Sequence, residues 1–130
     1  EPMQNLYTGV GGKTDFHEDV YTSSIREIKE ETGLDVDKLE LRAIIKTILE
    51  GKGSSWLLFV YTARRFSGEL IQCNEGDLYW IDIDNIYSYN LIGFIRRILP
   101  YILDEKGLLE GTIRHDAQGN VIKEKLKHTF

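Results

Sequence analysis

The residues most suited to chemistry are three glutamates, Glu27, Glu30 and Glu31. On an α-helix, residues three and four positions apart lie on one face. Like charges at these spacings repel by roughly 0.2–0.5 kcal/mol per pair, so the arrangement does not stabilise a helix by itself. A hard divalent cation makes it favourable, because Mg²⁺ and Mn²⁺ prefer carboxylate oxygen. An isolated Glu-x-x-Glu-Glu sequence is more often a solvated helix face, so the neighbouring residues must decide.

The segment that carries these glutamates is expected to be a helix over Val20–Thr32. Asp19 is suited to cap its N-terminus, and Gly33 stands where a helix commonly ends. The side chains expected to form a buried stripe on another side of this helix are Val20, Ser24, Ile25 and Ile28. The acidic face is therefore expected to look into a cleft.

The residues around this helix follow a longer pattern. Residues 12–34 read G-x5-E-x7-R-E-U-x-E-E-x-G-U, where U is apolar, and every fixed position is met. A chance match is expected roughly once in ten million chains of this size. The pattern resembles the signature of the Nudix hydrolase family. The resemblance implies a loop–helix–loop that holds Mg²⁺ or Mn²⁺ against a diphosphate.

The resemblance also implies a role for each charged residue of the pattern. Glu27, Glu30 and Glu31 fall on the family's metal-binding and base positions, with Glu31 preferred as a ligand and the base left open. Glu18 matches the first glutamate and is expected to support the phosphate-binding loop. Arg26 is expected to orient a carboxylate by a fork-shaped pair, with a plain surface ion pair as the alternative.

Two adjacent glycines lie ahead of the pattern's first glutamate, and the second of them is the first residue of the pattern. Gly11 and Gly12 lack a Cβ, so their backbone can approach a phosphate or a metal closely. We expect them to belong to the phosphate-binding loop. Many relatives have proline where this chain has Val10, and glycine where it has His17. These differences concern the shape of the loop and leave the predicted metal binding unchanged.

Beyond the signature, the chain is similar to the MutT-like branch of the family, which includes oxidised-purine nucleoside triphosphatases. The similarity lies in residues 66–70 and 74–80. It implies that Glu75 is a further metal ligand or base, with a surface loop carboxylate as the alternative. Trp80 is expected in the core more than at a surface that stacks on a base.

Recognition of a nucleobase needs polar groups in an apolar or aromatic pocket. Tyr87, Tyr89 and Asn90 precede the second expected helix, where relatives often contact the base, and they are candidate substrate-binding residues. Trp56 is a further candidate, although a core position in a strand is expected more for this residue.

The remaining pattern predicts an α/β or α+β fold in which a mixed sheet lies between helices and a C-terminal β-hairpin closes the chain. The expected elements are strands at 39–49, 56–62 and 78–83, a helix at 91–103, and hairpin strands at 111–115 and 121–126. We expect one domain over residues 1–130. The first residues are expected to be a loop, too short for the family's usual opening strands, so N-terminal residues are expected to be missing, with an abbreviated fold as the alternative.

Composition limits the partners. The chain has 16 basic and 21 acidic residues and a net charge of −5, which argues against a nucleic-acid polymer but not against a small polyphosphate. Cys73 is the only cysteine, so no internal disulfide forms and a cytoplasmic location is expected. No apolar run is long enough for a membrane span. A monomer or a homodimer is expected.

Three functions are compatible with these features. The first is a nucleoside triphosphate pyrophosphohydrolase of the MutT or 8-oxo-dGTP diphosphatase type, which yields a nucleoside monophosphate and pyrophosphate. The second keeps the reaction but changes the substrate to a nucleoside diphosphate derivative such as ADP-ribose. The third is a catalytically silent Nudix binding module, which the intact glutamates disfavour.

Overall fold

The computed structural model describes residues 6–7, 17–71, 78–104 and 106–129. The chain divides into two compact units, each assembled from separate segments. Unit 1 contains residues 1–8, 41–62 and 90–130, and unit 2 contains residues 9–40 and 63–89. The prediction that residues 1–130 act as one domain is not tested by this division.

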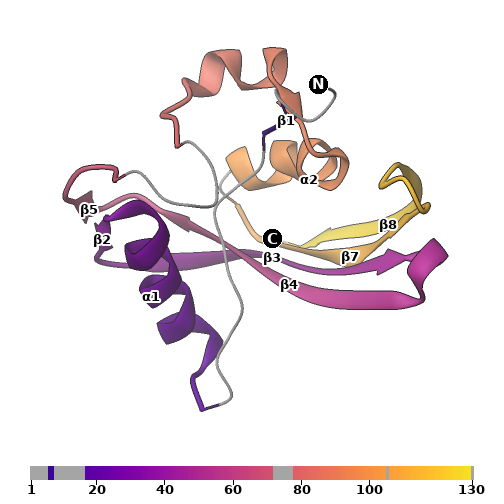
Figure 1. Cartoon of the computed structure of the whole chain (residues 1–130), viewed down its shortest axis with the longest axis horizontal. Helices are drawn as coiled ribbons and strands as arrows, with labels where there is room; N and C mark the ends of the chain where they lie inside the picture. The colour runs from indigo at the N-terminus through magenta and orange to yellow at the C-terminus, as the bar shows by residue number, and fades with distance from the viewer. Residues whose placement is uncertain (1–5, 8–16, 72–77, 105, 130) are drawn as a thin grey trace. The chain divides into compact units, whose positions relative to one another are not determined.

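Unit 1 is built on a four-stranded mixed sheet (Figure 1). In spatial order its strands are β4 (Ser54–Ala63), β3 (Leu39–Leu49), β7 (Leu108–His115) and β8 (Val121–Thr129). β3 and β7 run parallel, whereas β7 and β8 are antiparallel neighbours in the chain. The predicted mixed sheet and C-terminal hairpin are therefore confirmed.

Two short connections set the register of these strands. The 3₁₀ helix η1 (Glu50–Lys52) and Gly53, with a φ of 63°, join β3 to β4. Between β7 and β8, the carboxylate of Asp116 accepts hydrogen bonds from the backbone N–H groups of Gln118 and Asn120 at 3.0 and 2.9 Å. These bonds lower the pKa of Asp116, with the Asn120 N–H as the largest cause.

The core of unit 1 lies between the sheet and helix α2 (Gly93–Leu103), as Figure 1 shows. Two helix residues and four strand residues form it, namely Ile98, Ile102, Ala43, Ile45, Leu109 and Ile113. Each large buried side chain contributes about 1.5–3 kcal/mol relative to an exposed position. The strand residues alternate with outward-facing neighbours, which explains why the period-two pattern identified these strands.

The start of the chain differs from the expected loop. β1 (Leu6–Tyr7) pairs in parallel with β6 (Asn90–Leu91), and the helix predicted from residue 91 begins two residues later. None of the described helices is long and apolar enough to cross a bilayer.

Unit 2 contains helix α1 (Val20–Thr32) and a small antiparallel pair formed by β2 (Asp35–Val36) and β5 (Phe66–Ser67). It also contains the 3₁₀ helix η2 (Ile83–Ser88). Asp37 at the end of β2 donates its backbone N–H to the carbonyl of Arg65 at 3.0 Å, which closes this small pair.

The strand predicted at 78–83 is wrong, because its described residues include no strand. A local interaction prevails there: the carboxylate of Asp82 accepts the N–H of Asp84 at 3.1 Å and caps η2. The core position expected for Trp80 is also wrong. Its side chain is 66% exposed and stacks on Phe66 with ring centroids 5.3 Å apart.

Candidate functional site

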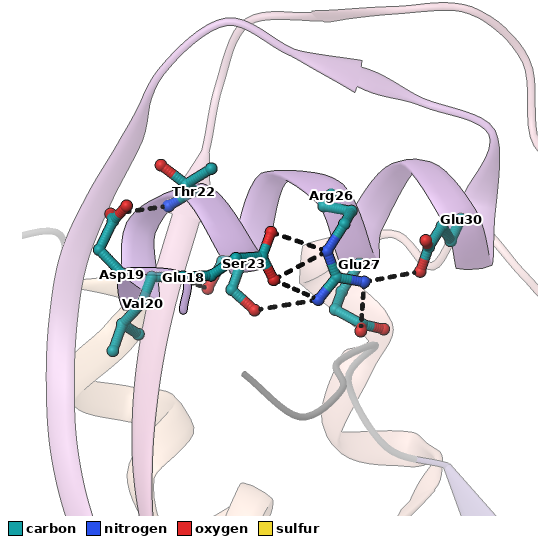
Figure 2. Close-up of polar contacts among 9 residues, drawn as sticks. Glu18, Asp19, Val20, Thr22, Ser23, Arg26, Glu27 and Glu30 are labelled. Carbon is teal, nitrogen blue, oxygen red and sulfur yellow. Dashed lines mark hydrogen bonds and ion pairs between the residues drawn. The ribbon is translucent and has the colours of Figure 1, made fainter. Parts of the chain in front are cut away.

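The helix that carries the glutamates begins and ends where its sequence predicts. The carboxylate of Asp19 accepts the N–H of Thr22 at 3.0 Å, and this bond lowers the pKa of Asp19 (Figure 2). At the other end Gly33 has a φ of 82° and donates its N–H to the carbonyl of Lys29 at 2.9 Å. This is a left-handed cap that favours glycine.

Contacts within unit 2 also require glycine at this position. A Cβ on Gly33 would lie 2.7 Å from a methyl carbon of Ile71 and 2.9 Å from the carbonyl oxygen of Glu69. The adjacent residue, Thr32, accepts a backbone hydrogen bond from Ile71 at 2.9 Å. The end of α1 is therefore held tightly against residues 69–71.

A second contact fixes the start of α1. The hydroxyl of Tyr21 accepts the N–H of Leu39 at 3.1 Å, which joins the first turn of the helix to the start of β3. The fully buried residues on α1 are Ser23 and Thr32, whereas the four residues expected to be buried, Val20, Ser24, Ile25 and Ile28, are half-buried.

Arg26 is the centre of the polar cluster on α1 (Figure 2). Its Nε donates to both oxygens of Glu18 at 3.0 and 2.9 Å, and its Nη2 donates to Oε1 of the same carboxylate at 2.7 Å. Its Nη1 donates at 2.9 Å to Oε1 of Glu27 and at 2.9 Å to Oε2 of Glu30. One guanidinium therefore holds three carboxylates of the signature.

The three pairs differ in how far water reaches them. The side chains of Glu18 and Glu27 are 23% and 19% exposed, whereas that of Glu30 is 58% exposed. An exposed pair at i and i+4 contributes about 0.3–0.5 kcal/mol. The plain surface ion pair considered for Arg26 therefore fits only its contact with Glu30. The fork-shaped contact with Glu18 has the geometry of an orienting pair.

The sequence did not identify two members of this cluster as partners of Arg26. Glu18 is eight residues away and outside the helix, so helical periodicity could not place it opposite the guanidinium. Ser23 is buried, and its hydroxyl lies 3.3 Å from Nη2 of Arg26. Its position three residues before Arg26 on one helix face was the available signal.

The predicted metal ligands that the structure describes have suitable oxygen donors, but these donors do not lie close enough together to bind one ion. Among the described residues, no three Asp, Glu, His or Cys side chains lie close enough together to hold a metal ion. Glu27 and Glu30 each bond Arg26 through one oxygen, which leaves the second oxygen of each for another partner. All-carboxylate donors fit Mg²⁺ or Mn²⁺.

Several predicted site residues lie outside the described residues, namely Gly11, Gly12 and Glu75. Glu31 lies on α1, half-buried, on the helix face that its spacing predicts. The catalytic and metal-binding roles of all these residues remain predictions.

The four candidate base-binding residues fall in both units. Trp56 lies on β4 and Asn90 on β6 in unit 1, whereas Tyr87 lies in η2 of unit 2 and Tyr89 directly after it. The core position expected for Trp56 is wrong, because this side chain is 51% exposed. Tyr87 and Asn90 are also exposed. A shared base pocket remains a prediction.

Comparison with known proteins decides the family. The family model of the NUDIX domain matches residues 1–102, well over half of the chain. The chain belongs to the Nudix family. It is therefore a Nudix hydrolase, and the members of this enzyme family are pyrophosphohydrolases. The predicted family and enzyme class are confirmed. The family generally uses a divalent metal and acts on nucleotide-like substrates, which agrees with a set of predicted ligands made only of carboxylates.

Individual relatives are distant in sequence but similar in fold. The chain is 27% identical over 130 residues to the uncharacterized Nudix hydrolase YvcI of Bacillus subtilis, covering 97% of this chain and 82% of that protein. It is 28% identical over 120 residues to the oxidized purine nucleoside triphosphate hydrolase of Danio rerio, covering 92% and 76%.

A solved structure confirms the predicted α+β Nudix fold. The crystal structure of a mutator MutT protein from Bacillus halodurans matches with a TM-score of 0.91 at 27% identity. The match covers 98% of this chain and 86% of that one.

Proposed function

We propose that this Nudix hydrolase is a nucleoside triphosphate pyrophosphohydrolase of the MutT type, which releases a nucleoside monophosphate and pyrophosphate. The observation that carries the proposed chemistry is the guanidinium of Arg26, which bonds Glu27 and Glu30 on α1 and Glu18 just ahead of it. The choice of substrate is supported by the similarity to an oxidized purine nucleoside triphosphate hydrolase and to a MutT protein.

In the proposed reaction, water attacks a phosphorus atom of the α–β diphosphate linkage and the bond from that phosphorus to the bridging oxygen breaks, which gives a nucleoside monophosphate and pyrophosphate. A divalent cation, when bound, neutralises charge on the phosphoryl oxygens. Glu27, Glu30 and Glu31 are the candidate ligands, and one carboxylate of this helix takes the proton from the attacking water. Arg26 holds Glu18, Glu27 and Glu30 through its guanidinium and so limits the positions that these carboxylates take before a metal binds.

The proposed substrate class is an oxidised purine triphosphate such as 8-oxo-dGTP. The test is to incubate the full chain with Mg²⁺ and a panel of unmodified deoxynucleoside triphosphates, 8-oxo-dGTP and ADP-ribose, with products separated by ion-exchange chromatography. We expect monophosphate and pyrophosphate, with kcat/KM highest for 8-oxo-dGTP. Release of orthophosphate alone, or faster turnover of ADP-ribose, contradicts the proposal.

A matched pair of variants on α1 tests the assignment of the glutamates. Glu31→Gln keeps the size of the side chain but removes its charge, and we expect activity to fall by roughly 10²–10⁴-fold. Lys29→Gln is the control, because Lys29 is exposed and pairs with Asp35 instead of the Arg26 cluster. Circular dichroism should show the same helix content in both. Wild-type activity in Glu31→Gln contradicts its assigned role.

A further inference from the structure

Arg42 differs from every other arginine that the structure describes. It lies on β3, is only 7% exposed, and its Nε and Nη2 are inaccessible to water and have no hydrogen-bond partner. The other described arginines all have partners: Arg26 contacts Glu18, Arg65 contacts Asp37, Arg97 contacts Glu124, Arg114 contacts Glu50, and Arg64 and Arg96 make contacts as well. Arg42 therefore holds a buried charge without a counter-ion.

Such an arrangement is costly. A guanidinium stays protonated at any physiological pH, so Arg42 cannot become neutral as a buried lysine can. Each buried donor without an acceptor costs about 1–3 kcal/mol, and an unpaired buried charge costs more. The cost is removed when an anion presents two oxygens to Nε and Nη2, the fork geometry that carboxylates and phosphates share.

The position of Arg42 on the sheet shows which face such an anion approaches. Ala43 and Ile45 point into the core of unit 1 and are fully buried. Because side chains alternate along a strand, Arg42 lies on the opposite face, together with Ile44 and Lys46. Ile44 is half-buried and Lys46 is exposed, so this face opens to solvent along the strand.

The same face carries further positive charge. The strand register places Lys46 beside Thr112 and Thr112 beside Lys125, so that these residues form a row across the sheet. In the next row, Ile44 lies beside Glu110, and Glu110 beside Lys127. The three lysines are exposed.

This charge pattern favours an external anion over one of the chain's own carboxylates. Glu110 lies on the adjacent strand and on the same face, yet it leaves Nε and Nη2 of Arg42 unbonded. Exposed lysines on the same face of the sheet as Arg42 attract an anion and raise its local concentration. The face is thus basic although the chain as a whole is acidic.

We propose that Arg42 binds a phosphate-type oxyanion, through Nε and Nη2, at this face of the sheet. The chemical class of this oxyanion rests on the proposed function, whose reaction releases pyrophosphate. The proposal requires the guanidinium to turn toward the exposed part of this face, because its Nε and Nη2 are inaccessible to water in the free protein. Lys46, Lys125 and Lys127 guide the anion to the site.

The test is calorimetric titration of the full chain with pyrophosphate in the presence of EDTA, so that binding is measured without metal or turnover. We expect Arg42→Met to weaken binding at least tenfold and Arg42→Lys to weaken it less, because lysine keeps the charge but loses the fork. Lys52→Met is the control, because Lys52 is exposed in η1 and lies outside this face of the sheet, and we expect it to change the affinity by less than threefold.

Thermal unfolding without ligand separates binding from a structural role. Since the proposal leaves Arg42 unpaired in the free protein, Arg42→Met should unfold at the same or a higher temperature than the wild type. A lower unfolding temperature with unchanged pyrophosphate affinity overturns the proposal. If Arg42→Met does not fold, Arg42→Lys decides alone: unchanged affinity in this variant also overturns the proposal.

Two further arms identify the source of the oxyanion. The first probe is a triphosphate analogue with a non-hydrolysable methylene bridge, which represents the substrate, and the second is pyrophosphate, which represents the product. The probe that binds more tightly, and whose affinity falls in Arg42→Met, is assigned to the site. The absence of Arg42-dependent binding of both overturns the inference. Glu31→Gln should bind pyrophosphate like the wild type, so loss of turnover and loss of oxyanion binding are distinguishable failures.

Discussion

Arg26 holds Glu18 through both carboxylate oxygens, 2.9 and 3.0 Å from Nε, while Nη2 lies 2.7 Å from one of them. Glu18 stands before the N-cap of α1, and Arg26 lies two turns further along. The pair therefore ties the segment ahead of the helix to the helix itself. It also fixes the guanidinium so that Nη1 faces Glu27 and Glu30.

This geometry predicts a large effect of a small substitution. We expect Arg26→Lys to lower kcat/KM by about 10–100-fold, the range typical for residues that orient metal ligands, because one ammonium cannot hold three carboxylates at once. Arg65→Lys is the matched control, since Arg65 pairs with Asp37 at an exposed position in the same unit. Steady-state kinetics of both variants, with circular dichroism as the measure of folding, checks this prediction.

Removal of metal is expected to abolish turnover without unfolding the protein. Helix α1 is capped by its own flanking residues, Asp19 and Gly33, and the described hydrophobic core of unit 1 includes none of the proposed metal ligands. EDTA should therefore leave the unfolding temperature nearly unchanged. Added Mg²⁺ should raise the unfolding temperature, because binding stabilises the folded protein by about 2.7 kcal/mol at one hundred times the dissociation constant.

Variants of the proposed ligands test whether these carboxylates bind the metal. Glu27→Gln and Glu30→Gln should each shift the Mg²⁺ dependence of the unfolding temperature to higher concentration, as measured by scanning fluorimetry. An unchanged Mg²⁺ midpoint in both variants contradicts the prediction that these carboxylates bind the metal.

The sequence predicted α1 to the residue because its signals are local. Asp19 caps its start and Gly33 takes a left-handed conformation at its end, both confirmed. Helical spacing also placed Arg26 next to Glu27 and Glu30. The same reasoning could not pair Arg26 with Glu18, since the backbone ahead of a helix follows no period.

Burial was harder to predict than secondary structure, as the two tryptophans show. Both were expected in the core, yet Trp56 and Trp80 are 51% and 66% exposed. An aromatic residue favours a strand or a packed surface, but which neighbours cover it depends on tertiary structure. The strand predicted at 78–83 failed for a related reason, because the cap formed by Asp82 determined the local backbone.

Among the glycines that the structure describes, Gly111 on β7 is expected to be the least tolerant of substitution. A Cβ there would lie 2.1 Å from the carbonyl oxygen of Lys125 and 2.9 Å from a methyl of Leu126, so β8 must shift. We expect Gly111→Ala to destabilise the protein by about 2 kcal/mol or more, as overpacking of a buried contact does. Gly53→Ala is the control: its Cβ meets nothing within 4 Å, and its φ of 63° costs about 1–2 kcal/mol. Urea unfolding of both variants measures the difference.

The last prediction concerns how the stability of the protein depends on pH. The N–H of Thr22 lowers the pKa of Asp19 in the folded protein, so the cap stabilises α1 fully above the unfolded pKa of about 3.9. That stability is lost as the pH falls through the lower folded pKa. Asp19→Asn keeps a neutral acceptor for the helix N-terminus.

The unfolding temperatures of wild type and Asp19→Asn should therefore differ most near neutral pH and converge below pH of about 4, as the carboxylate of Asp19 becomes protonated. Asp19→Ala, which removes the acceptor, should remain less stable than Asp19→Asn across the range. A gap between wild type and Asp19→Asn that widens on acidification contradicts the assignment, because a carboxylate with a lowered pKa contributes least where it is protonated.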